Sequence, residues 1–212
     1  VANKNLINEG IPKNRVFLVG DTMIDSLLYE LNTAKRKSRK KLGLGNSKYA
    51  VLTLHRQANV DNRSTFSLII SSMNELSKKI RIFFPVHPRA LKRIKSFKIK
   101  CSNNIRFLPP LNYSDFLVLM LGSKFMITDS GGIQVETSVL NIPCFTLRNN
   151  TERPFTLTQG TNVLIGKDKE LLIRESDKIL SGRWKKSRLV DFWDGKSCER
   201  IAGIIFRNLC KR

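Results

Sequence analysis

The chain has 212 residues, of which 41% are hydrophobic and 26% are charged, and its formal net charge is +21. This composition is typical of a globular protein and excludes a disordered or fibrous chain. The length allows one large domain or two small ones, and either can bury a core. No run of 18 apolar residues occurs, so a membrane span is not expected, and no signal peptide is expected either.

The cysteine content favours a reducing compartment. The four cysteines are widely spaced and form no C-x-x-C pair: Cys101, Cys144, Cys198 and Cys210. This spacing predicts neither a disulfide framework nor a zinc site, and no other metal-ligand cluster is evident. We therefore expect a cytoplasmic protein without a metal.

The high positive charge raises the question of nucleic-acid binding. Basic residues are dense at 35–41, 89–100 and 183–188. Nucleic-acid modules usually interleave such residues with aromatic side chains or glycine. Here the aromatic residues lie in apolar runs such as 81–85, which favours a solvated basic surface.

Short apolar runs alternate with amphipathic stretches along the chain. In chain order the patterns predict a strand over 16–19, a helix over 22–41, a strand over 49–54, a helix over 62–79, a strand over 82–84, a helix over 90–97, a strand over 105–108, a helix over 113–121, a strand over 125–128, a helix over 132–140, strands over 143–146 and 163–165, and helices over 169–180 and 197–210. This alternation indicates βαβ units, and thus a doubly wound, Rossmann-like α/β fold with a parallel sheet. Such sheets bind ligands at the carboxyl ends of their strands.

Polar residues follow the first three predicted strands. Gly20 permits a tight turn, and Asp21 is placed to cap the next helix. His55 and Arg56 follow the second strand, where they suit contact with a phosphate or transfer of a proton. His87 follows the third strand, at the equivalent place on a neighbouring strand, so both histidines of the chain are expected to line one crevice. The alternative is a loop histidine satisfied by the backbone for His55 and a rigid, Pro-flanked turn for His87.

The most informative segment follows the predicted strand over 125–128. Ser130, Gly131 and Gly132 precede a helix, so free N–H groups and the helix dipole favour a phosphate there. Glu136 lies about one turn into that helix, where a carboxylate can accept hydrogen bonds from a ribose. A plain helix cap is the alternative interpretation.

Two arginines lie on the polar stretch after residue 146. Arg148 and Arg153 could clamp a diphosphate or a sugar; a surface loop with Arg–Glu pairs is the alternative. No Walker loop or Ser-His-Asp order appears. The residues alone predict a parallel α/β domain that binds an anionic ligand, with a nucleotide favoured.

Taken together, these segments resemble the second half of the UDP-N-acetylglucosamine 2-epimerase family, in its non-hydrolysing branch. The motifs are Val-Gly-Asp-Thr-Met-Ile-Asp (19–25), Thr-Leu-His-Arg (53–56) with Asn59, Pro-Val-His-Pro (85–88), Pro-Leu-Asn-Tyr-Ser-Asp-Phe (110–116), Thr-Asp-Ser-Gly-Gly-Ile-Gln (128–134) with Glu136, and Thr-Glu-Arg-Pro (151–154) with Gly160-Thr161. The resemblance implies the C-terminal half of a GT-B-type two-domain fold. It also implies interconversion of UDP-GlcNAc and UDP-ManNAc by elimination and re-addition of UDP, without a metal or other cofactor.

The resemblance assigns roles to individual residues. His55 matches the active-site histidine near the departing diphosphate, and Arg56 is expected to contact the UDP-sugar. The turn of residues 130–132 matches the diphosphate site. Further matches are Glu136 on the ribose, Phe116 near the uracil, Arg153 on the UDP-sugar and His87 near a second, regulatory sugar nucleotide.

The sequence also departs from the family pattern. Ala58, Val135 and Phe155 stand where the family usually has Glu, and Asp21 stands where Asn is common. The loss of three carboxylates leaves open a non-catalytic module that still binds a nucleotide sugar. A glycosyltransferase half on the same fold and, less favoured, a basic nucleic-acid-binding protein are further alternatives.

The length and the start at Val1 favour a fragment or one part of a split enzyme. We expect residues 1–196 to form the UDP-binding domain and residues 197–212 to form a helix that crosses toward a missing N-terminal domain or companion chain. The apolar stripe of that helix would need such a partner. The resemblance implies that the whole enzyme is a homodimer. It also implies that this chain is inactive by itself.

Overall fold

The computed structural model describes residues 2–37, 43–44, 47–188 and 190–210. Contacts group the chain into two compact units: Val1–Tyr29 with Leu189–Arg212 (unit 1), and Glu30–Arg188 (unit 2). In the described part of the chain, no helix combines the length and the apolar character needed to cross a membrane. The expected division into a domain of residues 1–196 and a crossing helix of residues 197–212 stays a prediction.

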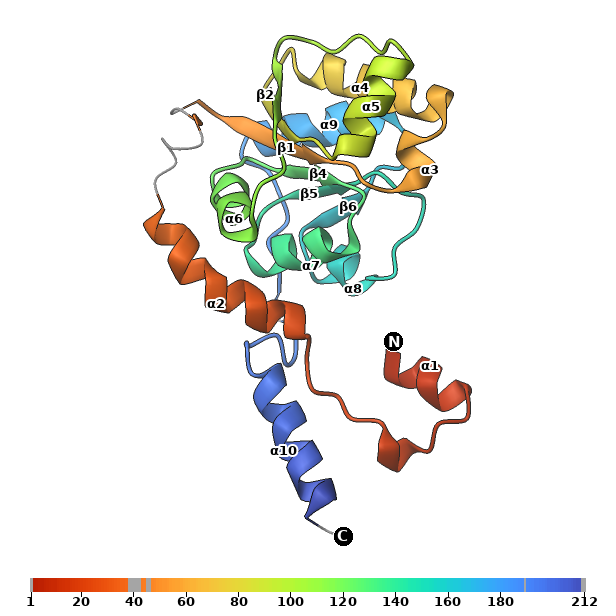
Figure 1. Cartoon of the computed structure of the whole chain (residues 1–212), viewed down its shortest axis with the longest axis vertical. Helices are drawn as coiled ribbons and strands as arrows, with labels where there is room; N and C mark the ends of the chain where they lie inside the picture. Colours follow the sequence, from red (N-terminus) through yellow and green to blue (C-terminus); the bar gives the residue numbers. More distant parts are fainter. Residues whose placement is uncertain (1, 38–42, 45–46, 189, 211–212) are drawn as a thin grey trace. The chain divides into compact units, whose positions relative to one another are not determined.

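Unit 2 is built on a six-stranded parallel sheet (Figure 1). Its strands are β1 (Tyr49–Thr53), β2 (Arg81–Pro85), β3 (Ile105–Leu108), β4 (Met126–Thr128), β5 (Cys144–Thr146) and β6 (Asn162–Leu164). Their order is β3-β2-β1-β4-β5-β6, and every neighbouring pair is parallel. This is the doubly wound order whose direction reverses between β1 and β4, so the predicted fold class is confirmed.

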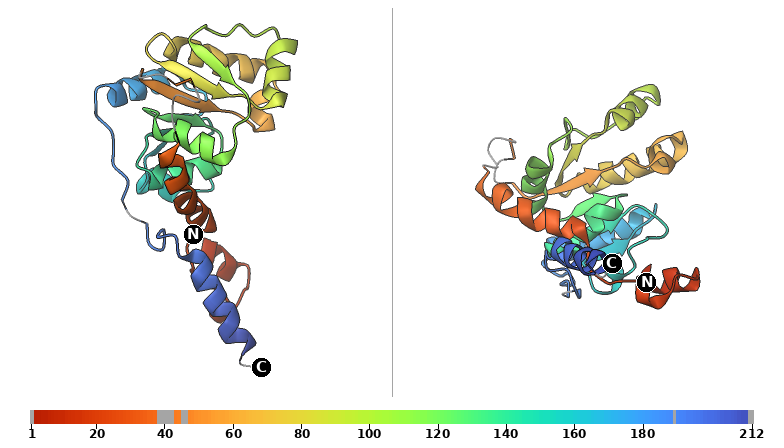
Figure 2. Two further views of the ribbon diagram at one scale, coloured as in Figure 1. Left: turned by 60° about the vertical axis from the view of Figure 1, so that its left-hand side comes forward. Right: turned by 60° about the horizontal axis from the view of Figure 1, so that its bottom comes forward.

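Helices cover both faces of this sheet. They are α3 (Gln57–Val60), α4 (Arg63–Leu76), α5 (Pro88–Ser96), α6 (Tyr113–Leu121), α7 (Gly131–Val139), α8 (Phe155–Thr158) and α9 (Lys169–Leu180). Figure 1 shows α4, α5 and α9 on one side of the sheet and α6, α7 and α8 on the other. Figure 2 shows the same layers from two further directions. Strands β1, β2, β4 and β5 are therefore largely buried, as their apolar runs require, whereas the edge strand β3 exposes Arg106 and Phe107.

The core follows from the alternation of side chains along the strands. Leu52 and Phe84 belong to one buried cluster with Phe66 and Ile70 of α4. Tyr49 is also buried; its hydroxyl donates a hydrogen bond to the carbonyl oxygen of Leu119 in α6 (2.9 Å). Burial on both faces fixes the register of the sheet, because a slip by one residue would exchange the faces.

Side-chain caps define where several helices of unit 2 begin. Asn62 accepts a hydrogen bond from the Thr65 N–H at the start of α4 (3.0 Å), and Asp168 accepts one from the Leu171 N–H at the start of α9 (2.8 Å). Asn112 caps α6 through the Asp115 N–H (2.9 Å). Such caps satisfy N–H groups that have no partner within the helix.

The predicted ends of helices and strands agree best with the structure where a capping residue and a regular apolar period coincide. The strand over 105–108 and the helices over 113–121 and 169–180 are confirmed at both ends. The helix predicted over 22–41 is α2 (Thr22–Arg36), which ends earlier than expected; residues 38–41 lie outside the described part. The short helices α3 and α8 were not predicted.

Unit 1 contains α1 (Ala2–Asn8), a 3-10 turn η1 (Lys13–Arg15), the first part of α2, and α10 (Ser197–Leu209). The strand predicted over 16–19 is wrong: these residues form no strand, and Phe17 and Leu18 are half exposed. An apolar run becomes a strand only where a neighbour supplies ladder hydrogen bonds. All six strands of the sheet lie between residues 49 and 164.

Two residues of the segment 19–25 hold α10 within unit 1. The Asp25 carboxylate accepts hydrogen bonds from the Ser197 N–H (3.1 Å) and the Cys198 N–H (2.7 Å) at the start of α10. Gly20 has a φ of +107°, and a Cβ there would lie 2.4 Å from the carbonyl oxygen of Phe192. Glycine is therefore required for this close approach of two chain segments. Asp21 caps α2 through the Met23 N–H (3.0 Å), as expected.

Candidate functional site

One group of polar residues lies at the carboxyl ends of β1 and β4. This is the switch point of the sheet, at which the progression of the strand order reverses. The chain leaves β1 through His55 and Arg56, and leaves β4 through Asp129 and Ser130. The side-chain oxygens of Thr53 and Thr128, the last residues of the two strands, lie 2.7 Å apart. This contact holds the two strand ends together.

Asp129 is the centre of this group, and its side chain is completely buried. Oδ1 of Asp129 lies 2.7 Å from Nδ1 of His55 and 3.2 Å from the His55 backbone nitrogen. Oδ2 accepts hydrogen bonds from the Arg56 N–H (3.0 Å) and from Nδ2 of Asn59 (3.1 Å). Each carboxylate oxygen thus faces two donors, which offsets the cost of burying its charge.

This geometry changes the acidity of both partners. The hydrogen bond that His55 donates to the Asp129 carboxylate raises the pKa of His55 above its ordinary value of 6.5, although burial and Arg56 act in the opposite direction. Burial would raise the pKa of Asp129, but the hydrogen bonds from His55, Arg56 and Asn59 hold it below 3.8. With Nδ1 of His55 engaged by the carboxylate, Nε2 of this half-exposed ring is left for a ligand.

The N-terminus of α7 lies directly beyond Asp129. Ser130 is its N-cap, and the Ser130 side chain makes no capping hydrogen bond to α7. The backbone N–H of Ser130 donates to the Thr128 hydroxyl (3.0 Å). The N–H groups of the first helical turn have no partner within the helix and favour an anion. Gly131 carries no side chain to block access to this helix end.

Glu136, further along α7, is buried and accepts a hydrogen bond from the Tyr113 hydroxyl (2.8 Å). Burial raises the pKa of Glu136. Burial and the Glu136 carboxylate together raise the pKa of Tyr113. Phe116, which the sequence also assigned to this site, is half-buried and lies on α6 together with Tyr113.

The loop after β5 brings a further carboxylate to the site. Nη1 and Nη2 of Arg148 donate to the two oxygens of Glu152 at 2.5 and 2.7 Å, and Nη2 of Arg56 lies 3.5 Å from the same carboxylate. These contacts lower the pKa of Glu152 to about 2. The Arg–Glu pairing considered from the sequence is thus present at Arg148. Arg153 is half-buried in the same loop.

His87 serves the start of a helix. It follows β2 and caps α5, because its Nδ1 accepts a hydrogen bond from the Arg89 N–H (3.2 Å). Arg89 also pairs with Asp61, and Nε of Arg93 lies 3.2 Å from the same carboxylate. His55 and His87 thus follow two neighbouring parallel strands but have different hydrogen-bond partners, and their expected place in one crevice stays a prediction.

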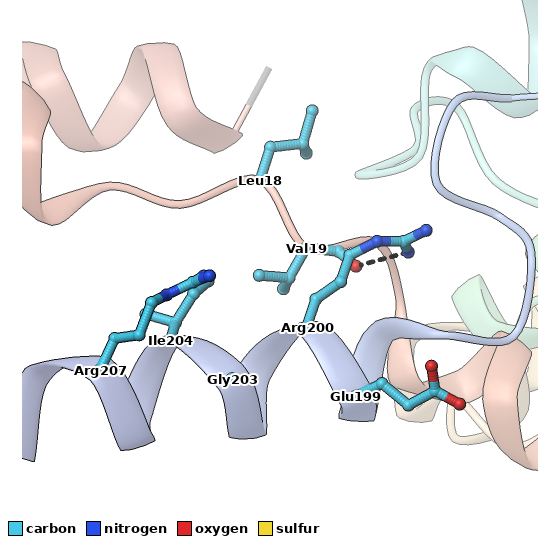
Figure 3. Close-up of a pocket in the computed structure, with 7 residues that line it drawn as sticks. All are labelled: Leu18, Val19, Glu199, Arg200, Gly203, Ile204 and Arg207. Atoms are coloured by element: carbon cyan, nitrogen blue, oxygen red, sulfur yellow. Dashed lines mark hydrogen bonds between the residues drawn. The ribbon is translucent and has the colours of Figure 1, made fainter.

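Two hollows differ in whether predicted site residues line them. One of about 300 Å³ adjoins the switch point and is lined by three cationic side chains and no acidic one: Arg56, Ala58, Asn59, Leu147, Arg148, Asn149, Asn150, Gly166 and Lys167. The other, in unit 1, is a groove of about 420 Å³ along α10 that contains none of the predicted site residues (Figure 3). The basic hollow beside Asp129 is the better candidate for an anionic ligand.

Sequence reasoning did not identify Asp129, Asn59, Tyr113 or Glu152 as site residues. Asp129 and Glu152 stand inside the motifs that were singled out, next to Ser130 and Arg153. A carboxylate directly after a strand at a switch point was the available signal. No group of three metal-ligating side chains occurs among the residues that the structure describes.

The fold and the site define a doubly wound α/β domain with an anion-attracting site at its switch point. The sequence profile of the UDP-N-acetylglucosamine 2-epimerase family matches residues 1–206, and the chain belongs to this family. It is 38% identical to the UDP-N-acetylglucosamine 2-epimerase of Methanocaldococcus jannaschii over 97% of this chain and 58% of that enzyme. The chain thus spans little more than half the length of this curated relative.

Solved structures show the same relationship. The M. jannaschii enzyme in complex with UDP-GlcNAc and UDP superposes with a TM-score of 0.86 at 38% identity, covering 97% of this chain and 59% of that one. The Neisseria meningitidis enzyme bound to UDP-GlcNAc gives 0.82 at 28% identity, with 97% and 59% covered. An E. coli heptosyltransferase with ADP, 16% identical with a TM-score of 0.50 over 71% of this chain and 48% of that one, shares the fold alone.

Proposed function

We propose that this chain is the UDP-binding, C-terminal part of a UDP-N-acetylglucosamine 2-epimerase, and that epimerisation requires a further N-terminal half. The family membership and the names of the relatives support the reaction. The length of those relatives supports a second half, since the chain covers 58% of the M. jannaschii enzyme. In this proposal the chain alone binds the nucleotide but does not catalyse epimerisation.

The observation that carries the proposal is the Asp129–His55 pair beside the N-terminus of α7. Asp129 orients the imidazole, so that Nδ1 donates to the carboxylate and Nε2 faces the ligand. The raised pKa of His55 increases its protonated fraction near neutral pH. A cation of this kind stabilises the negative charge that develops on a departing diphosphate.

The proposed reaction begins with removal of the proton at C2 of the sugar. The C1–O bond then breaks, UDP leaves with the bonding electrons, and a 2-acetamidoglucal remains. Re-addition of UDP at C1 and protonation of C2 on the opposite face give the epimer. In this scheme His55 assists the departure and return of UDP, and the base that removes the C2 proton comes from the missing half.

The remaining residues position the nucleotide. In this proposal the first turn of α7, from Ser130 to Gly132, holds the diphosphate through its N–H groups. Glu136 accepts hydrogen bonds from the ribose while one of its oxygens stays bound to the Tyr113 hydroxyl. Phe116 lies against the uracil, and Arg56 and Arg153 contact the UDP-sugar.

The larger assembly is part of the same proposal. Residues 1–196 would form the UDP-binding domain, and residues 197–212 would cross to the N-terminal half. Ile205, Phe206 and Leu209 of α10 are 53%, 68% and 64% exposed, as a helix awaiting a partner would be. We also propose a cytoplasmic homodimer for the complete enzyme, with His87 near a second, regulatory sugar nucleotide.

Fusion of the N-terminal part of the M. jannaschii enzyme to this chain tests the proposed function. The fusion is expected to form UDP-ManNAc from UDP-GlcNAc, and a His55→Gln variant of it is expected to lose most of that activity while still binding UDP. A folded fusion that binds UDP without epimerising it would favour a non-catalytic module. Activity unchanged by His55→Gln would contradict the role of the histidine.

A further inference from the structure

A carboxylate of the protein itself lies at the anion-attracting end of α7. Oε2 of Glu152 lies 4.0 Å from the position that a Cβ on Gly131, the first residue of α7, would occupy. The same carboxylate receives two hydrogen bonds from Arg148 and lies 3.5 Å from Nη2 of Arg56. Glu152 therefore engages two guanidinium groups, those of Arg148 and Arg56, while it lies beside the glycine turn.

Both the backbone beside Glu152 and one of its arginine partners are held in place. The Thr151 hydroxyl donates to Oε1 of Gln134 (2.6 Å), and Gln134 is completely buried in α7. Nε of Arg56 donates to the carbonyl oxygen of Asp129 (3.0 Å). The Glu152 side chain itself is 61% exposed. Rotation of this side chain into solvent can thus release Arg148 and Arg56 without movement of the loop.

We propose that Glu152 is an internal competitor for the anion site, and that it determines which anions the site accepts. A diphosphate displaces the Glu152 carboxylate and takes over Arg148 and Arg56, whereas an anion of low charge does not. The inference rests on the proposed function only for the identity of the natural diphosphate ligand. It adds a specificity-determining residue to that site.

The selectivity follows from a comparison of charges. A small anion of low charge would bind the two arginines little more strongly than the bidentate Glu152 carboxylate already does, so it does not displace that carboxylate. A diphosphate carries more charge and also reaches the N–H groups of α7, so it can displace the carboxylate. Because the Arg148–Glu152 pair is exposed on the glutamate side, its loss has little effect on folding.

Calorimetric titration of the whole chain with inorganic pyrophosphate, inorganic phosphate and UDP tests this inference, in the same buffer at about 150 mM salt. The test variant is Glu152→Gln, which keeps the shape of the side chain. The matched control is Glu170→Gln, because Glu170 is an exposed carboxylate on α9 and its loss changes the net charge equally. Glu152→Gln is expected to bind pyrophosphate and UDP on the order of 10-fold more tightly and to gain measurable phosphate binding.

Equal or weaker pyrophosphate affinity in Glu152→Gln than in the unaltered chain would overturn the inference, as would the same gain in Glu170→Gln. A second variant, Arg148→Gln in the Glu152→Gln background, should reverse the gain, because Arg148 is the group released to the ligand. The proposed function is judged separately. If pyrophosphate binding rises as expected but UDP binds no better than pyrophosphate, the inference about Glu152 stands and UDP recognition fails.

Discussion

Replacement of Asp129 by Asn should destabilise the protein and abolish the raised pKa of His55. Oδ1 of Asp129 faces the side chain and backbone nitrogen of His55 at 2.7 and 3.2 Å, and Oδ2 faces donors of Arg56 and Asn59 at 3.0 and 3.1 Å. An Asn amide NH₂ at the Oδ2 position meets two N–H donors; at the Oδ1 position it meets the His55 backbone N–H, and Nδ1 can accept its hydrogen bond only after His55 has lost the proton there. Because the Asp129 side chain is completely buried, we expect the free energy of unfolding to fall by about 3–5 kcal/mol.

The loss of stability in Asp129→Asn should depend on pH. The pKa of His55 is raised in the folded protein, so the stability gained from the His55–Asp129 pair is fully present below 6.5 and is lost as the pH rises through the folded pKa. The destabilisation by Asp129→Asn should therefore be larger at about pH 5.5 than at about pH 8.5. In the variant, the pKa of His55 should fall to 6.5 or below, since only burial and Arg56 still act on it.

Urea unfolding at these two pH values measures the stability, and an NMR titration of the imidazole protons measures the pKa. His87 is the only other histidine of the chain, so the two signals can be assigned with a His87→Gln variant. A loss of stability below about 1 kcal/mol, or a His55 pKa that stays above 6.5 in Asp129→Asn, would refute this account of the site.

Three further predictions concern packing, capping and binding. Gly160→Ala should lower the free energy of unfolding by about 1–3 kcal/mol, because its Cβ would lie 2.2 Å from the Ser138 hydroxyl; an unchanged urea midpoint would contradict this. Asp25→Ala should cost about 0.5–2 kcal/mol and speed hydrogen exchange at the start of α10, where equal exchange would show that the cap is dispensable. UDP binding should weaken as the pH rises from about 7 to 9, because His55 loses its proton while the terminal phosphate is already ionised. In His55→Gln this pH dependence of the UDP affinity should vanish. A pH dependence that persists in the variant would exclude His55 as its source.

The sequence predicted the parts of the fold that depend on local signals. The helices over 113–121 and 169–180 begin at capping residues, Asn112 and Asp168, and carry regular apolar periodicity. The segment 16–19 carries an equally apolar run, but whether such a run pairs depends on a neighbour that the local sequence does not specify. The helices α3 and α8 have four residues each, too few to show a helical period.

The site was predicted in part for the same reason. His55 and Ser130 follow strand ends, and Glu136 lies about one turn into the helix that Ser130 caps, so their positions could be read from local patterns. The role of Asp129 depends on contacts with residues 70 to 74 positions away, which only the order of the strands brings together. Glu152 contacts arginines of two different loops: the local pairing with Arg148 was considered from the sequence, whereas the approach of Arg56 depends on the order of the strands.

Calorimetric titration of the chain with UDP at about 150 mM salt tests the central claim most directly, with Ser130→Asp, Glu136→Ala and the control Glu170→Gln measured alongside. Asp is a good N-cap, so Ser130→Asp should keep α7 folded while its charge repels the diphosphate. The account predicts saturable binding at one site, retained in Glu170→Gln and lost in the other two variants. Binding that both site variants retain at full strength, or that uridine without phosphate reproduces, would contradict it.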